Sequence, residues 1–555
     1  MSGEDTDINN GGGGHQKSPS PTVRKVNQHL AVSGLGDFMT QSSILVDFLS
    51  QDFSRESISD CQVTFNDNYS NIARVLGDEF GRGFSEGVYH HRDAPFVKTS
   101  QGGLPRTLTP AERCVLELQS AFVLPSQSLS DSFVTAFFDR VYPALPSVNR
   151  SDFMRRYYTM GSENTGLSLL LLHSILLAGS TTYRHPDLAL PASEVSRRLF
   201  VRAHALMENR FEQDRLILVQ SHLLFSTFAT DSCDDTVQNM WLSIGAAARI
   251  AQGMGMHRSL GNAIAGVAMR RSWKRIWWTL VIHDTLCSFE WGRPRAIDFE
   301  LEETGALPNA EATQFLKSVC NLCFIIGGWL NLLRPGNRRR KRQGKDEIQT
   351  WHQGLPAILQ PPLQLTGFSL WSATLHITYC ATMLRFAALL HDGIETVHAM
   401  AAQITKTCED LNSQGLLYSL WNFGIHELDL AMGQHARQVN GKNEEAACSA
   451  FQKLQTGLPL IRLLSERSSV AAQGAAFYEK LVQQTMSKNG TAIDAQHEDD
   501  AATLQGGQPH EMGEEKPGDT QLPAHVPDWL YDLDLLPFSD WAPRTNHPWG
   551  WDIVE

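Results

Sequence analysis

The 555-residue sequence contains no long apolar run, and it opens on polar and glycine-rich residues rather than on a secretory signal. Its most apolar stretch, residues 167–179, is shorter than a membrane span and includes a histidine and two serines. Segments that alternate polar and apolar residues at a period of two are few, so a sheet is not expected. These absences predict an all-α protein that makes no contact with membranes.

The sequence also lacks the motifs of common enzymes, among them HExxH, GxSxG and the phosphate-binding P-loop. Cys320 and Cys323 form a CxxC pair inside an apolar segment, but no second ligand pair for zinc stands nearby. The His-Asp pairs at 283–284 and 391–392 are similar to the metal ligands of HD-type phosphohydrolases, which makes a helical metal hydrolase a distant alternative. We predict no catalytic residue, no metal site and no cofactor.

The nine cysteines are odd in number and lack framework spacing, which favours a reducing compartment. The formal net charge of −13 is concentrated at the end of the chain. From Asp494 onward there are 14 acidic and 2 basic residues, which leaves 46 acidic and 45 basic residues before it. The body is therefore nearly neutral and lacks the strongly basic balance of a self-sufficient DNA-binding domain.

Two helical patterns anchored by tryptophans stand close together in residues 239–298. In each, apolar residues recur at three- and four-residue steps, and glycines mark the end. Asp284 lies on the apolar stripe of the second helix, where a carboxylate needs a cation or several donors. Arg249 and Arg293 are its candidate partners. The residues that characterise this region are Trp241, Arg249, Trp277, Trp278, Asp284, Gly292, Arg293 and Pro294.

Residues 136–158 place an aromatic helix before a turn with two prolines, Pro143 and Pro146, followed by Phe153. Together with the two later helices, this arrangement resembles the middle homology region of the fungal-specific transcription factors, over about residues 131–299. The resemblance implies a multi-helix regulatory domain in a nuclear transcription regulator of a metabolic or secondary-metabolite pathway. It also implies partners: coactivators or the transcription machinery, and a second copy or a DNA-binding regulator as a dimer partner.

The DNA-binding module of that family holds two zinc ions with six cysteines, spaced C-x2-C-x6-C and then the same again. Only Cys61 precedes Cys114 here, so the zinc cluster is not expected in this chain. DNA contact would then be indirect, through a partner, or would need an N-terminal module missing from the sequence as given.

We expect five parts along the chain. Residues 1–108 are predicted to be mostly disordered, with one amphipathic helix at 35–53. Residues 109–299 hold the core helices of the regulatory domain, including 167–179, 193–208 and 215–230. Residues 300–362 hold an apolar helix at 313–333 and a basic loop, and residues 491–555 form an acidic aromatic tail. Between them, residues 363–490 hold further helices at 369–391, 394–412, 417–438, 444–466 and 470–485.

Seven basic residues lie between Arg334 and Lys345, and five of them are consecutive: Arg338, Arg339, Arg340, Lys341 and Arg342. Such a run is too costly to bury, which predicts an exposed loop. We interpret it as a nuclear import signal, with phosphate contact or a merely solvated loop as alternatives.

The last part of the chain interleaves acids with large apolar side chains, among them Trp529, Leu533, Leu536, Phe538 and Trp541. This pattern is typical of activation segments that fold into a coactivator groove. A tail that docks on the protein's own helices is the competing interpretation. For the whole chain, the alternative from another class is an all-α metabolite-binding sensor or scaffold with no DNA contact.

Overall fold

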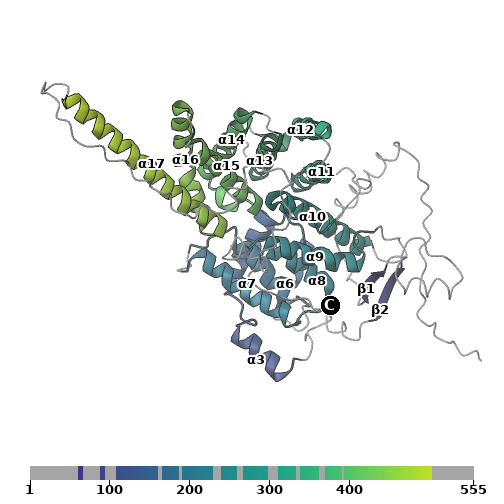
Figure 1. The fold of residues 1–555 in the computed structure, drawn as a ribbon. Helices are drawn as coiled ribbons and strands as arrows, with labels where there is room; N and C mark the ends of the chain where they lie inside the picture. Colours follow the sequence, from purple (N-terminus) through teal and green to yellow (C-terminus); the bar gives the residue numbers. More distant parts are fainter. Residues whose placement is uncertain are drawn as a thin grey trace, which may run out of the picture.

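The computed structural model of the protein is an array of α-helices, so the predicted all-α fold is confirmed (Figure 1). The structure describes residues 61–66, 88–93, 108–160, 166–186, 190–228, 239–258, 267–297, 311–332, 338–361, 369–390, 393–439, 441 and 443–502. The expected helix at 35–53 and the residues of the predicted activation segment lie outside these ranges.

Within the described part, the helices follow one another with short connections. In chain order they are α3 (Pro110–Leu118), α4 (Gln127–Ala136), the π-helical turn Phe137–Val141, α5 (Arg150–Tyr158), α6 (Leu169–Ser180), α7 (Ala192–Glu208), α8 (Arg215–Phe225), α9 (Met240–Met254), α10 (Val267–Trp291), α11 (Glu311–Leu332), α12 (Arg338–Gln353), α13 (Leu370–Leu390), α14 (Ile394–Ser413), α15 (Asn422–Val439), α16 (Glu444–Ser465) and α17 (Ser469–Ala502), with 3-10 turns at Ala357–Leu359 and Leu417–Ser419.

Polar side chains determine where several helices begin, because they accept hydrogen bonds from amides that have no partner in the first turn. Thr109 and Glu112 form a reciprocal capping box at the start of α3. At the starts of α6, α8 and α9, the side chains of Ser168, Asp214 and Asn239 each accept a hydrogen bond from an amide of the first turn. At the other end of α9, Gly255 adopts φ +80°, the left-handed conformation that favours glycine after a helix.

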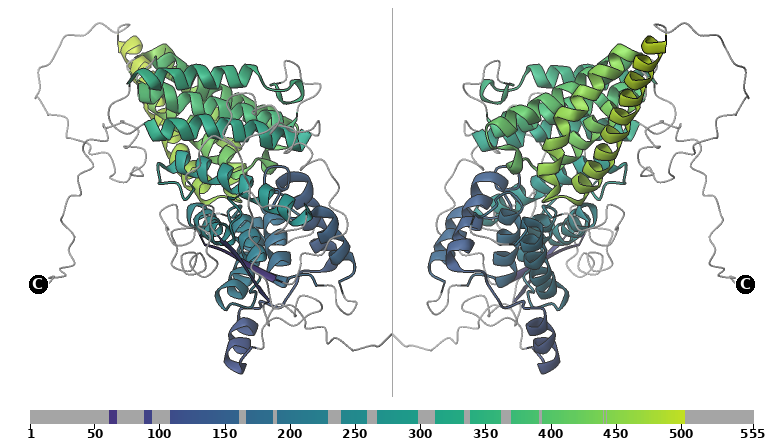
Figure 2. Two further views of the ribbon diagram at one scale, coloured as in Figure 1. Left: turned by 90° about the vertical axis from the view of Figure 1, so that its right-hand side faces the viewer. Right: turned by 90° about the vertical axis from the view of Figure 1, so that its left-hand side faces the viewer.

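The earlier and the later helices gather around separate hydrophobic cores at opposite ends of the molecule (Figures 1 and 2). The first core is built by α4 to α9 and the first half of α10, and the second by α13 to α17. A third core joins them, with contributions from the start of α9, the second half of α10, α11 and α13. The helix expected at 313–333 is thus α11, and it packs deep in this middle layer.

Gly179 on α6 allows an unusually close approach to α4. A Cβ atom at this position would lie 2.0 Å from the carbonyl oxygen of Phe133 and 2.7 Å from its carbonyl carbon. Because these are backbone atoms, a larger residue would push the two helices apart in the first core.

Three expectations about secondary structure are wrong. Strands β1 (Cys61–Asn66) and β2 (Val88–Asp93) pair antiparallel beside α9, where no sheet was expected. Residues 417–438 are not one helix but a 3-10 turn followed by α15. Helix α17 extends past 485 into the predicted tail, to Ala502, through residues with good helix propensity such as alanine, glutamine and glutamate.

The basic run Arg338–Arg342 is also not a loop, because it forms the first turns of α12. Lysine and arginine are good helix formers, so a basic run can be helical without being buried. Among the helices that the structure describes, none combines the length and the apolar character needed to cross a membrane.

Candidate functional site: a pocket between the two helical halves

Four of the residues that characterise the sequence around 239–298 meet at the corner where α10 ends: Trp241, Gly292, Arg293 and Pro294. Gly292 adopts φ +62° and turns the chain away from the helix axis. The indole Nε1 of Trp241 on α9 donates to the carbonyl oxygen of Pro294 at 3.0 Å, and the guanidinium of Arg293 lies 5.4 Å from the centre of the Trp241 ring. This corner therefore ties the start of α9 to the end of α10.

Asp284 is buried on α10, as its place on the apolar stripe predicts, with only 2% of its surface exposed. Its two carboxylate oxygens accept from the backbone amides of Ala296 at 3.0 Å and Ile297 at 2.8 Å. The expected partner Arg293 lies on Trp241 instead, so that part of the prediction is wrong. Burial raises the pKa of Asp284, while the two amides and the charges of Arg295 and Arg249 oppose the rise.

Arg249 donates to the side chain of Gln252, one turn along α9. Trp277 and Trp278 are adjacent on α10 but serve different neighbours. The Trp277 ring lies 5.7 Å from that of His257, and the Trp278 ring packs edge-on against Phe324 of α11 at 5.8 Å. These predicted signature residues therefore fix the packing of α9, α10 and α11.

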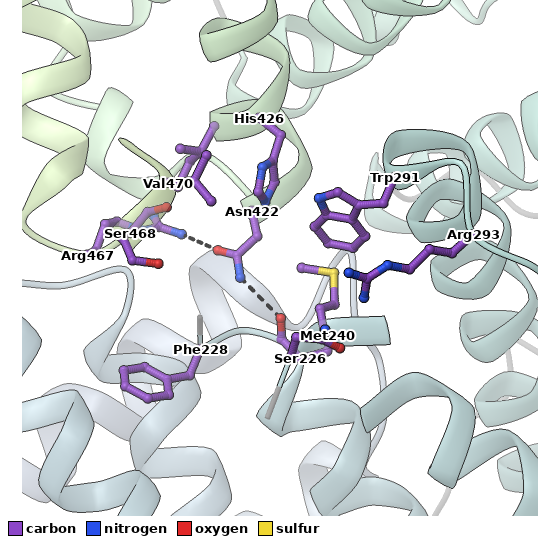
Figure 3. Close-up of a pocket in the computed structure, with 13 residues that line it drawn as sticks. Ser226, Phe228, Met240, Trp291, Arg293, Asn422, His426, Arg467, Ser468 and Val470 are labelled. Carbon is purple, nitrogen blue, oxygen red and sulfur yellow. Dashed lines mark hydrogen bonds between the residues drawn. The ribbon is translucent and has the colours of Figure 1, made fainter. Parts of the chain in front are cut away.

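Next to this corner is a pocket, shown in Figure 3, between the earlier and the later helices. It encloses about 650 Å³ of space between atoms, its open mouth included. Its walls come from the end of α8, the start of α9, the end of α10, the start of α15 and the turn between α16 and α17. The lining residues are Ser226, Phe228, Asn239, Met240, Trp291, Arg293, Asn422, Ile425, His426, Arg467, Ser468, Ser469 and Val470. We call this space the junction pocket.

A chain of hydrogen bonds crosses one wall of the junction pocket and links both halves (Figure 3). Arg467 donates to the Oδ1 of Asn422 at 2.8 Å, and the Nδ2 of Asn422 donates to the carbonyl oxygen of Ser226 at 3.1 Å. A second nitrogen of Arg467 donates to the carbonyl oxygen of Tyr418 at 2.6 Å. Ser226, Asn422 and Arg467 also line an adjoining cavity of about 430 Å³, so this chain stands between two spaces.

The Arg467 guanidinium has no acidic partner among the described residues, although it lies 5.9 Å from the centre of the Tyr418 ring. The residue is 9% exposed, and both of its hydrogen-bond acceptors are neutral. Its Nε is buried without an acceptor. Burial lowers the pKa of Arg467 to about 10, which leaves the guanidinium charged at neutral pH. A buried charge with only neutral partners costs folding free energy.

His426 lines the same space but adds no charge. Burial, aided by the charge of Arg385, lowers the pKa of His426 to about 4, so its imidazole is neutral near pH 7. Its ring lies edge-on to Trp291 at 5.1 Å. Behind it, Glu290 forms an ion pair with Arg385 at 2.8 Å.

Other candidates from the sequence do not form a site in the described residues. Cys320 and Cys323 are buried on α11, where burial raises the pKa of Cys320 to about 12 and that of Cys323 well above its usual range, so both are unreactive thiols. The Nδ1 of His283 donates to the carbonyl oxygen of Thr279 at 2.9 Å. Across the described ranges, no three histidine, cysteine or acidic side chains come together as metal ligands would. The pair at 391–392 lies outside those ranges.

The sequence did not predict the junction pocket. Asn422, His426 and Arg467 lie more than 120 residues after Trp291, and no local pattern connects them with it. The available signal was weak: Ser468 and Ser469 between two helical patterns are typical of a helix start, and Arg467 beside them is a donor near that start.

Residues 134–320 match the family model described as the fungal specific transcription factor domain. Among similar curated proteins is the acetamidase regulatory protein of Aspergillus fumigatus, 31% identical over 65% of this chain and 49% of that protein. Cutinase transcription factor 1 alpha of Fusarium vanettenii is 26% identical over 78% of this chain and 51% of its own length. A fusaric acid cluster transcription factor of Gibberella moniliformis is 24% identical over 43% and 33%. The chain thus spans about half the length of the first of these relatives.

Proposed function

We propose that this chain, which belongs to the family that carries the fungal specific transcription factor domain, is a nuclear regulator of genes for a metabolic or secondary-metabolite pathway. The observation that carries the proposal is the match of residues 134–320 to that domain, joined to relatives that are named as regulators and transcription factors. Proteins of this kind are regulators and not enzymes. The junction pocket supports control by an effector. The matched domain supplies about half of its walls and the later helices supply the rest, so a bound ligand would contact both parts of the chain.

The proposal is tested by fusing the whole chain to an unrelated DNA-binding domain in front of a reporter gene. We expect transcription to change relative to the DNA-binding domain alone. A matched control carries Gly179→Trp, which disrupts the first core because the Cβ already meets the backbone of α4. If the wild-type fusion gives the same transcription as the DNA-binding domain alone, the chain does not regulate transcription by itself; a difference between the wild-type fusion and the control shows whether the folded first core is needed.

DNA contact is proposed to come from a partner, such as a DNA-binding regulator or a second copy, or from a module N-terminal to these residues. Residues before Asp494 are nearly neutral in net charge, so we expect the chain alone to bind DNA weakly and with a steep dependence on salt. Retention on DNA of random sequence at increasing salt measures this, and a sequence-selective complex at physiological salt would contradict it.

Nuclear import is proposed to depend on the basic run at the start of α12. Changing Arg338, Arg339, Arg340, Lys341 and Arg342 to alanine keeps a strong helix former at every position. We expect a fluorescent fusion of this variant to move to the cytoplasm. The control changes Arg197 and Arg198 to alanine, since these exposed residues of α7 pair with Glu194. A nuclear five-alanine variant would show that the run is not the signal.

Activation is proposed for residues 527–541. Replacing Trp529, Leu533, Leu536 and Phe538 with alanine removes the apolar side chains and leaves the charge unchanged. We expect the wild-type segment, fused to a DNA-binding domain, to activate a reporter and the variant to be inert, because a coactivator groove binds the apolar groups. The same assay with Trp541→Ala tests the edge of the segment.

A sensor without DNA contact is the second candidate, and the junction pocket is the observation that favours it. The two functions differ in the reporter assay, since a pure sensor would bind a metabolite and leave transcription unchanged.

A further inference from the structure

The junction pocket is positively charged and lacks an acidic side chain. Two of its lining residues, Arg293 and Arg467, are arginines, and none of the described lining residues is aspartate or glutamate. Trp291 and Arg293 lie on one side of the space, and Arg467 and Asn422 lie on the other (Figure 3). A group bound between them would therefore face guanidinium charge from two directions.

Arg467 is held ready for an anion at a cost to the fold. Its acceptors, the Tyr418 carbonyl and the Asn422 amide oxygen, bear no net charge, and its Nε has no acceptor although the side chain is more than nine-tenths buried. A carboxylate in the pocket would supply the missing negative charge in a site of low dielectric, where the attraction is strongest.

Three helices begin at this pocket, and three others, α8, α10 and α16, end there. Met240 opens α9, Asn422 opens α15 and Ser469 opens α17, and all three residues are in its lining. The N-terminal end of each helix carries a partial positive charge from its aligned peptide dipoles. The ends of α8, α10 and α16 carry the opposite partial charge, so the positive charge of the site comes from the two guanidinium groups.

The rest of the lining is apolar. Phe228, Met240, Trp291, Ile425 and Val470 contribute hydrocarbon or aromatic surface. The pocket is open to solvent, so part of a ligand can lie in its mouth. An inorganic anion would leave this apolar surface unused, whereas an organic acid would cover it.

We propose that the junction pocket binds a small organic carboxylate with an apolar body, its carboxylate held between Arg293 and Arg467 and its body against Trp291 and Met240. As an effector this ligand rests on the function proposed above, because it would join the two halves of a regulator. It would bridge the end of α10 to the start of α17 and so stabilise their present arrangement.

The test measures binding to the purified full chain with octanoate as the probe and octanamide as its neutral counterpart. Isothermal titration and thermal shift are expected to show that octanoate binds. Octanamide should bind on the order of 10-fold more weakly, or not at all, because it loses a charge-assisted hydrogen bond. Inorganic phosphate is expected to bind more weakly than octanoate because it buries no apolar surface.

Arg293→Gln is the principal variant, since Arg293 is partly exposed at the pocket edge and its loss should leave the fold intact. We expect it to weaken octanoate binding on the order of 10-fold, with octanamide unaffected. Arg467→Gln should weaken octanoate at least as much. Arg462→Gln is the matched control, because Arg462 is an exposed residue of α16 paired with Glu479.

The proposal is overturned if octanoate does not bind, if octanamide or phosphate binds equally well, or if Arg293→Gln folds and binds octanoate like the wild-type chain. These measurements use no DNA and no reporter. A chain that binds octanoate through Arg293 but never alters transcription would keep the ligand site and overturn only the proposed function.

Discussion

Two neighbouring regions each bury a charged side chain, and they differ in how completely its hydrogen bonds are satisfied. In the corner after α10, the Asp284 carboxylate receives two backbone hydrogen bonds, from Ala296 and Ile297. In the junction pocket, the Arg467 guanidinium has only neutral acceptors, one nitrogen without any, and an open space beside it. The corner is a closed structural unit, whereas the pocket retains unsatisfied charge at a place that a ligand can enter.

The difference shows that the corner stabilises the fold, whereas the pocket is free to bind a ligand. The tryptophans, glycine and proline of the corner are prominent in the sequence, yet their contacts are with each other and with the backbone. Apart from Arg293, the pocket residues are inconspicuous in the sequence, yet they combine burial, charge and empty volume. Mutations should therefore separate stability from binding between the two regions.

The largest loss of stability is expected from Asp284→Ala. The change leaves the amides of Ala296 and Ile297 without acceptors, and Ile297 is fully buried. We expect the free energy of unfolding to fall by about 2–4 kcal/mol. Urea denaturation measures it, with Asp346→Ala on the exposed side of α12 as the control. An unchanged midpoint would contradict a structural role for the corner.

A pH-dependent effect is expected at His426. Its pKa is lowered to about 4 in the fold from 6.5, so the unfolded chain binds a proton that the folded chain does not as the pH falls from 6.5 to 4. The stability that the neutral imidazole contributes is complete above pH 6.5 and is lost toward pH 4. Over this interval the unfolding free energy of His426→Gln should fall by about 3 kcal/mol less than that of the wild-type chain.

The other buried histidines are the same in both proteins, so they cancel in that comparison. Thermal melting at a series of pH values gives the difference. A constant offset between variant and wild type across the interval would show that His426 does not stay neutral in the pocket wall.

A smaller effect is expected from Trp241→Phe. The substitution removes the hydrogen bond to the Pro294 carbonyl and weakens the contact with Arg293, both at a partly exposed position. We expect a loss of about 1 kcal/mol in unfolding free energy and no change in octanoate affinity beyond a few-fold. A strong effect on binding with little effect on stability would move the corner into the binding site.

The smallest effect on stability is expected from Arg467→Met. The change removes two hydrogen bonds but also a buried charge that has no ion-pair partner among the residues that the structure describes, and apolar replacement of such charges is often nearly neutral. We expect a change within about 1 kcal/mol of wild type, together with loss of octanoate binding. Equal loss of stability from Arg467→Met and Asp284→Ala would erase the distinction between pocket and corner.

Much of the fold could be predicted from the sequence, because a helix follows from the local spacing of its apolar residues. The three-and-four spacing around Trp241 and the apolar stripe through Asp284 predicted α9, α10 and a buried carboxylate. The partner of that carboxylate could not be predicted in the same way. It depends on how the chain turns after Gly292, which brings two amides within reach of Asp284 before any arginine side chain is needed.

The sequence by itself determined the class of the fold, the position of most helices and the resemblance of about residues 131–299 to a known regulatory domain, which the family match over 134–320 confirms. Only the tertiary structure decided that the start of α15 at Asn422 and the turn at Arg467 lie beside the end of α10. These segments are distant along the chain, and no periodicity records the packing that brings them together. A pocket between two cores is a property of that packing, because its charge and volume exist only once two arginines and the ends of several helices share one space.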